Sequence, residues 1–259
     1  MKLLIRLGAD VNALNSDGDS TLHMAANTGH AEVANLLIQN GFDLTMDFGY
    51  KSPLHVVAQS GHFDVAKLLI ENGLDVNAIA ASSDHKWTPL ILACQVGHVE
   101  VATLLLENGA DIHATLPNKC NALLISCQYG HVEVVKMLVQ KGADLHSVDC
   151  KTWNCLHFAA KGEHQGEYLQ IVKFLIQNGA DVHSVLGFYN YTALFLAAEA
   201  GHADVVKYLI QKGADVKRLG YNKFAALHAA SERGHIDVVK ILIENGAVVN
   251  HVDGTKQSA

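Results

Sequence analysis

Residues 88–112 carry the hydrophobic and polar pattern of two short consecutive helices. In the second helix, Val101, Leu104 and Leu105 recur at the three-and-four spacing of one buried face, while Glu100 and other polar residues fall on the opposite face. The pair therefore has an apolar side that it cannot cover by itself, and the pattern predicts a neighbouring element that packs against it.

Start and stop signals mark the ends of both helices. Thr88 can cap the first helix with its hydroxyl, and Pro89 suits the first helical position because that position needs no N–H donor. Gly97 and Gly109 can end the two helices in the left-handed backbone conformation. These signals predict two helices of about eight to ten residues each, joined by a tight turn.

The same pattern recurs along the whole chain. Leucines equivalent to Leu90, called landmark leucines below, follow one another at steps of 32, 36, 33, 33, 38 and 33 residues. They are Leu22, Leu54, Leu90, Leu123, Leu156, Leu194 and Leu227. A period of this length indicates a repeat protein in which each helix pair covers the next.

The motifs within each period resemble those of the ankyrin repeat family. They are present as Ser52-Pro53-Leu54-His55, Gly201-His202 and Gly213-Ala214-Asp215. The resemblance implies an all-α solenoid of stacked helix pairs, with a projecting β-hairpin finger at each junction between repeats. It also implies that the histidine after the landmark leucine ties its helix to the adjacent finger.

The predicted organisation is a single ankyrin-repeat domain over residues 1–259, because no Pro/Gly/Ser-rich linker or charge block interrupts the array. Its parts are a partial repeat at 1–14, seven repeats at 15–47, 48–82, 83–115, 116–148, 149–186, 187–219 and 220–252, and a tail at 253–259.

Two repeats depart from the pattern and are expected to be the least regular. In Asn121-Ala122-Leu123-Leu124 the usual cap and histidine are replaced. In residues 162–168 four extra residues stand between the two helices of one repeat, where Gly-His is expected. A third change lengthens the finger at residues 78–83. Insertions in solenoids fall in loops, which carry function more often than helices do.

Composition and charge narrow the classes of function. A net charge of −7, with 19 basic and 26 acidic residues, provides no basic stripe for nucleic acid. No apolar run is long enough to span a membrane. Five cysteines without a paired framework favour a reducing compartment. We therefore expect a monomer in the cytoplasm, in its own cell or in one to which it is delivered, with neither nucleic acid nor membrane as partner.

The sixteen histidines are explained by the repeat instead of by chemistry. Most stand after a landmark leucine, in the Gly-His pair or after the Gly-Ala-Asp turn. Only one cluster has zinc-like residue types, namely His146, Cys150, Cys155 and His157. Two of its members occupy repeat positions that point in different directions, whereas a zinc site needs four ligands around one point. We expect no metal and no other cofactor.

The sequence offers no recognised catalytic motif. It contains neither a phosphate-binding glycine loop nor a nucleophile elbow. Glu163 and His164 near Cys155 are explained as loop composition. Asn12 and Asn77 resemble ankyrin asparagines that a dioxygenase hydroxylates, but a hydrogen-bonding turn residue is the simpler interpretation. We predict no catalytic residues.

Large aromatic residues mark the expected recognition surface. The residue three before each landmark leucine, called the ring position below, is aromatic in four of seven repeats, at Trp87, Trp153, Tyr191 and Phe224. Nearby finger positions and one first-helix end add Phe48, Tyr50, Tyr129, Phe188, Tyr189 and Tyr221. Exposed rings are typical of binding hot spots. The alternative is that neighbouring rings pack only against one another.

These observations predict a non-enzymatic scaffold that binds a protein or an extended peptide through its concave side, formed by fingers and first-helix ends. The alternative from another class is a regulatory or substrate-targeting segment of a larger enzyme or adaptor. A third possibility is a purely structural spacer.

The absence of a metal site can be tested directly. We expect protein purified under reducing conditions to contain no stoichiometric zinc, and chelation to leave its melting temperature unchanged, because repeat positions explain the histidines and cysteines. Elemental analysis and thermal melts with and without chelator measure this. A fall of several degrees with chelator would contradict it, since structural zinc contributes folding energy directly.

Overall fold

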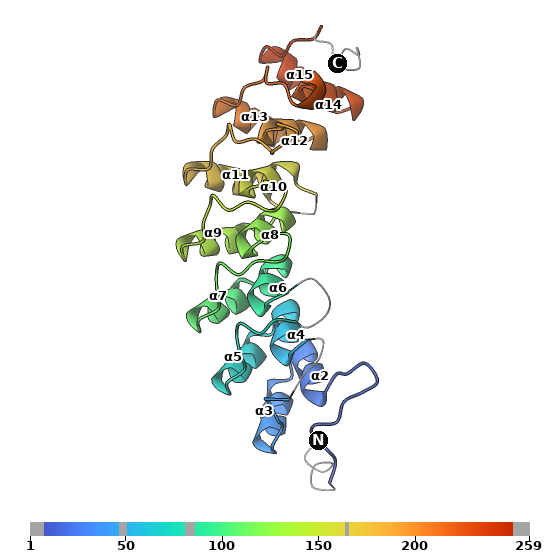
Figure 1. Cartoon of the computed structure of the whole chain (residues 1–259), viewed down its shortest axis with the longest axis vertical. Coiled ribbons are helices and arrows are strands. Elements are labelled where there is room, and N and C mark those ends of the chain that lie inside the picture. The colour runs from blue at the N-terminus through green and yellow to red at the C-terminus, as the bar shows by residue number, and fades with distance from the viewer. Residues whose placement is uncertain (1–7, 47–50, 81–85, 164–165, 251–259) are drawn as a thin grey trace. The chain divides into compact units, whose positions relative to one another are not determined.

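The computed structural model describes residues 8–46, 51–80, 86–163 and 166–250. Across these ranges the chain forms short α-helices in consecutive pairs, joined by loops (Figure 1). The predicted all-α fold is confirmed. None of the described helices is both long and apolar enough to cross a lipid bilayer.

The contacts of the chain gather into two compact units, Met1–Pro117 and Asn118–Ala259, which are described separately. The single-domain organisation stays a prediction. The helices of the first unit are α2 (Thr21–Thr28), α3 (Ala31–Gln39), α4 (Pro53–Ser60), α5 (Phe63–Glu71), α6 (Pro89–Val96) and α7 (Val99–Glu107). Those of the second are α8 (Ala122–Tyr129), α9 (Val132–Gln140), α10 (Cys155–Lys161), α11 (Tyr168–Gln177), α12 (Ala193–Ala200), α13 (Ala203–Gln211), the short 3₁₀-helix η2 (Tyr221–Lys223), α14 (Ala226–Glu232) and α15 (Ile236–Glu244).

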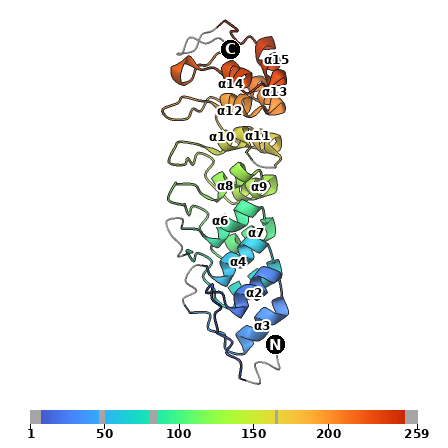
Figure 2. The same cartoon turned by 90° about the vertical axis from the view of Figure 1, so that its right-hand side faces the viewer.

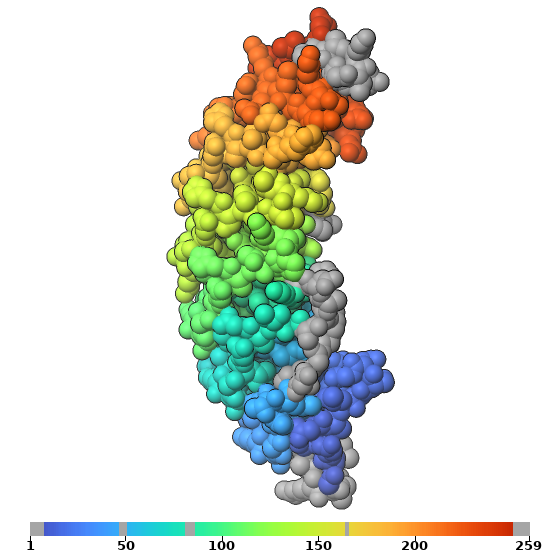
Figure 3. All heavy atoms as spheres, in the orientation of Figure 1, coloured from blue at the N-terminus to red at the C-terminus, as the bar shows by residue number. Residues whose placement is uncertain are grey.

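Within each unit, first helices pack on first helices and second helices on second helices. In the first unit α4 contacts α2 and α6, and α5 contacts α3 and α7. In the second, α8, α10, α12 and α14 form one row and α9, α11, α13 and α15 the other. Figure 3 shows the repeats of the second unit in contact on the face turned to the viewer. The landmark leucines are almost fully buried, and each contributes about 2 kcal/mol through the burial of apolar surface.

The repeat at Asn121 is as regular as its neighbours, contrary to expectation. Its helix α8 has eight residues, as do α6 and α12. The Asn121 side chain accepts a hydrogen bond from the Leu124 N–H at 2.9 Å and so supplies the cap that the sequence pattern lacks. Leu124 is fully buried in the position that histidine occupies elsewhere.

The histidines after the landmark leucines tie their helices to the following fingers, as the resemblance implied. The Ser20 N–H donates to His23 Nδ1 at 3.0 Å, which leaves Nε2 to donate to the Lys51 carbonyl at 2.8 Å. His55 and His157 make the equivalent contacts. Each imidazole thus joins two successive repeats.

A second contact between repeats is made by the histidine of the Gly-His pair. Nε2 of His235 lies 3.0 Å from the carbonyl oxygen of Glu199, two residues before Gly201. A Cβ at Gly201 would lie 2.6 Å from this imidazole, and its φ of +81° also requires glycine. His62 and His98 make the same contact in the first unit.

The repeat with the insertion replaces this histidine by a tyrosine. The Tyr168 hydroxyl donates to the Gln128 carbonyl at 3.0 Å, and Gln128 also stands two residues before the glycine that ends its helix. Gly130 and Gly166 approach so closely that a Cβ on either would clash with the other's backbone. The insertion therefore preserves the contact between repeats. His164 lies outside the described residues.

The fingers project on one side of each unit (Figure 2). Among the described residues, their strand pairing is limited to single antiparallel bridges such as Val185 with Thr192 and Leu219 with Ala225. Asn77 links one finger to the next turn, since its side chain accepts from the Asp111 N–H at 2.8 Å and donates to the Gly109 carbonyl at 3.0 Å. Asn12 accepts from the Asp43 N–H in the same way.

Stability should fall in mild acid because of the buried histidines. Burial lowers the pKa of His55 and His157 from the ordinary 6.5 to about 4. Between these values the unfolded chain binds protons that the folded chain does not, so their contribution is present above pH 6.5 and is lost as the pH falls towards 4. The loss of unfolding free energy between these pH values is about 3 kcal/mol at most for each of the two histidines.

Urea unfolding between pH 7.5 and 4 measures this dependence. His157→Leu should make it shallower, because leucine cannot be protonated and Leu124 shows that the position accepts it. An unchanged pH dependence in this variant would contradict the assignment to His157.

Candidate partner-binding surface

The four residues of the predicted ring position are half-buried, and they lie in both units. Trp87 belongs to the first unit, where its carbonyl accepts hydrogen bonds from His55 Nε2 at 3.2 Å and from the Ala80 N–H at 3.0 Å. Trp153, Tyr191 and Phe224 belong to the second unit. Two other predicted site residues, Phe48 and Tyr50, lie outside the described residues.

The turn that presents Trp153 is closed by Asp149. One carboxylate oxygen of Asp149 accepts the N–H groups of Lys151 and Trp153, both at 2.8 Å. The Asp149 N–H also donates to the Trp153 carbonyl at 3.0 Å. This pairing explains why Asp149 is buried although it is acidic. The indole is thereby held at a fixed place beside helix α10.

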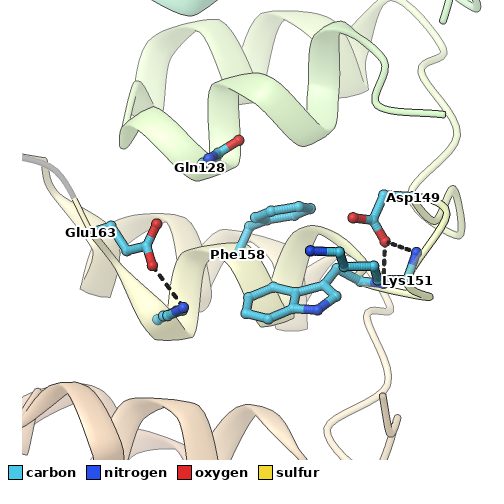
Figure 4. A pocket seen from close by; sticks show the side chains of 7 residues that line it. Gln128, Asp149, Lys151, Phe158 and Glu163 are labelled. Carbon is cyan, nitrogen blue, oxygen red and sulfur yellow. Dashed lines mark hydrogen bonds and ion pairs between the residues drawn. The ribbon is translucent and has the colours of Figure 1, made fainter. Parts of the chain in front are cut away.

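Trp153 lines a pocket of about 280 Å³. Its ring lies 5.1 Å from that of Phe158, and Lys161 Nζ lies 5.2 Å from the indole centroid. Figure 4 shows these side chains, with Lys161 also paired to Glu163 at 2.7 Å. The pocket is lined by Gln128, Asp149, Lys151, Trp153, Phe158, Lys161 and Glu163. The lining combines aromatic rings with charged side chains of both signs.

The next two fingers are joined to each other by hydrogen bonds. The Tyr221 N–H donates to the Tyr189 carbonyl at 2.8 Å. Arg218 Nη2 donates to Asn190 Oδ1 at 3.0 Å, and Asn190 Nδ2 donates to the Leu219 carbonyl at 3.3 Å. These bonds hold the rings of the two fingers in one cluster.

The inner rings of this cluster are packed. Tyr191 stacks on Phe195 with centroids 3.8 Å apart and planes 4° apart. Phe224 lies 6.1 Å from Phe195 and stacks on His228 at 5.3 Å. A Cβ at Gly220 would lie 2.4 Å from the Tyr191 ring, so this glycine is required by the close approach. Tyr191 and Phe224 thus make the ring contacts of the alternative while remaining half-buried, and their part in binding stays a prediction.

The outer rings of the cluster are exposed to solvent. The exposed fraction is 79% for Phe188, 55% for Tyr189 and 44% for Tyr221. Phe188 and Tyr221 each lie nearly perpendicular to Tyr189, with centroids 5.7 and 6.0 Å away. Such angled rings leave edges and faces open to a ligand. Tyr129 lies apart from the fingers, half-buried at the end of α8.

Sequence reasoning missed Phe195, Phe158 and Lys161. Phe195 stands in the position that histidine holds in four repeats, and this substitution was the signal that could have identified it. Phe158 and Lys161 show no such departure, because only the fold places them beside Trp153.

The cysteines and histidines of the zinc-like cluster lie in different surroundings. Among the described residues, no group of three or more His, Cys, Asp or Glu side chains is arranged to hold a metal ion. His146 and Cys150 are exposed, whereas Cys155 and His157 are buried. Burial raises the pKa of the Cys127 thiol well above its ordinary value and that of Cys120 to about 12. These two thiols are therefore poor nucleophiles.

The division into inner and outer rings can be tested by unfolding. We expect Tyr191→Ala to destabilise the protein by about 1–3 kcal/mol, because it removes a ring stacked on Phe195. Phe188→Ala should change stability by less than about 0.5 kcal/mol, since its side chain is exposed. Urea denaturation followed by circular dichroism compares them. Equal losses in both variants would show that the exposed ring is also structural.

Comparisons with known proteins identify the family. The model for ankyrin repeats (3 copies) matches residues 1–80, 45–116, 112–185 and 156–253. The crystal structure of the human ASB11 ankyrin repeat domain is similar, with a TM-score of 0.78 and 27% identity over 89% of this chain and 99% of that one.

Curated relatives match a shorter segment. They include protein fem-1 homolog C of human, mouse and cattle, each 51% identical over 45 residues. The match covers 17% of this chain and 7% of each relative's length. Because the family model spans most of the sequence, the chain belongs to the ankyrin repeat family, whose members are in general protein–protein interaction modules.

Proposed function

We propose that the chain is a non-enzymatic interaction scaffold, which binds a protein or an extended peptide through its finger rings and the adjoining ends of its first helices. The observation that carries the proposal is the exposure of Phe188, Tyr189 and Tyr221 on two fingers that hydrogen bonds hold together.

The exposed rings are suited to act as anchors because little ordering is needed when they bind. A Tyr or Phe side chain has two rotatable bonds, and neighbouring rings already restrict these three. Binding then buries a large apolar area at a small entropic cost. Tyr191 and Phe224 support this surface through their contacts with Phe195.

Trp153 provides a second point of attachment. Its pocket is open enough to admit one side chain, and its charged walls offer partners for polar groups. Trp87, Phe48, Tyr50 and Tyr129 belong to the same proposal as further contacts outside this cluster.

Capture from a lysate of the source cells tests the proposal. Proteins retained by the wild-type chain are compared with those retained by Tyr189→Ala and by Phe63→Ala. Phe63 is the matched control, because it is an aromatic residue with an exposed fraction of 37% that lies on helix α5 and not on a finger.

We expect Tyr189→Ala to weaken binding of the captured partner about thirtyfold, which corresponds to a hot spot of roughly 2 kcal/mol. Phe63→Ala should bind like the wild type. Isothermal titration with the purified partner gives the dissociation constants, and thermal melts verify folding. Unchanged affinity for Tyr189→Ala, Tyr221→Ala and Trp153→Ala alike would place recognition elsewhere.

A further inference from the structure

Three finger tips of the unit Asn118–Ala259 form one connected surface, called the finger plate below. It consists of residues 149–153, 187–191 and 218–224. The Gly187 N–H donates to the Thr152 hydroxyl at 2.6 Å, and the Tyr221 N–H donates to the Tyr189 carbonyl at 2.8 Å. Each tip is thus bonded to the next, on the side where the loops project in Figure 2.

The exposed charges of the finger plate are all positive. Its charged residues are Asp149, Lys151, Arg218 and Lys223. Asp149 is only 8% exposed, and its carboxylate accepts two backbone N–H groups. The other three are exposed. This local sign is opposite to the net charge of −7 of the whole chain.

Two of the nearby carboxylates already have basic partners, and a third, Asp215, accepts the Lys217 N–H. Glu163 is paired with Lys161 at 2.7 Å, and Glu199 is paired with Arg233 at 3.4 Å. Glu199 belongs to the first helix α12, and Glu163 follows the first helix α10. A ligand at the tips therefore meets exposed rings with basic groups between them.

Two classes of anionic ligand have apolar parts that could contact the rings, namely acidic peptides and single-stranded nucleic acids. Base stacking requires free ring faces. Tyr191 already stacks on Phe195 and lies in stacked contact with Tyr189, at 3.8 and 5.7 Å respectively. A nucleic acid also carries a negative charge on every nucleotide, so the net charge of −7 repels it more strongly than a peptide in which only some residues are acidic. Both observations favour a peptide.

We infer that the finger plate binds an acidic, extended segment of a partner protein. Apolar side chains of the segment contact Phe188, Tyr189 and Tyr221, and its carboxylates lie against Lys151, Arg218 and Lys223. The segment is extended because successive repeats supply the three tips in a row. This inference rests on the proposed function and specifies the chemistry of the partner.

Selection of random 12-residue peptides displayed on phage tests the inference. The wild-type chain is the target, and Tyr189→Ala is the target in a parallel selection. We expect the wild type to enrich peptides that carry several Asp or Glu residues together with apolar residues, and Tyr189→Ala to lose this enrichment.

Charge-reversal variants then test the role of the basic groups on one enriched synthetic peptide. Lys151→Glu and Lys223→Glu should each weaken binding about five- to tenfold, and raising the salt concentration should weaken wild-type binding. Lys207→Glu is the matched control, because Lys207 is exposed on the second helix α13 of the same unit. It should bind within about twofold of the wild type.

The outcomes separate the inference from the proposed function. Enriched peptides that depend on Tyr189 but are neutral or basic would keep the scaffold and overturn the acidic partner. Enrichment that does not depend on Tyr189, or none at all, would overturn both. Tighter binding of a fluorescent 12-nucleotide single-stranded RNA than of any enriched peptide would overturn the assignment to a protein partner.

Discussion

The structure depends on contacts that pass from each helix pair to the next, because no pair can bury its apolar side alone. Two kinds of ring contact fix the stacking within each unit. Histidines such as His23 and His157 join a helix start to the following finger. Rings such as His235 and Tyr168 lie over the glycine that ends the preceding first helix. These directional bonds set the register that leucine burial cannot specify.

The candidate surface depends on the same contacts between successive repeats. Since finger tips of the second unit are hydrogen-bonded to one another, rings placed there keep fixed positions and are presented to solvent without collapsing onto the core. Phe195 shows how closely the two roles are related. It stands where other repeats have the tying histidine, and its ring supports Tyr191 instead. At this position, a residue that supports the surface thus replaces the histidine that ties the helix to the next finger.

The same constraint explains which departures the array tolerates. Asn121 replaces the usual hydroxyl cap because its amide reaches the same N–H, and Leu124 replaces a histidine by filling the core. The insertion after Gly162 is accepted because Tyr168 reaches the carbonyl that a histidine would contact. Asn121 thus keeps the helix cap and Tyr168 keeps the contact between repeats, whereas Leu124 replaces a polar tie by apolar burial.

The sequence by itself determined the repeats, their helix ends and the rings at finger tips, because these follow from local spacing, caps and glycines. Only the tertiary structure decided which rings are exposed and which are packed. Tyr189 and Tyr191 are two residues apart, yet one is largely exposed and the other stacks on a helix. Likewise, the pairing of Trp153 with Lys161 and the bonds between fingers join residues from different elements. The bond from Gly187 to Thr152 depends on how repeats stack, and the contacts of Trp153 and Tyr191 depend on how each finger lies against its own first helix, which the spacing of residues does not encode.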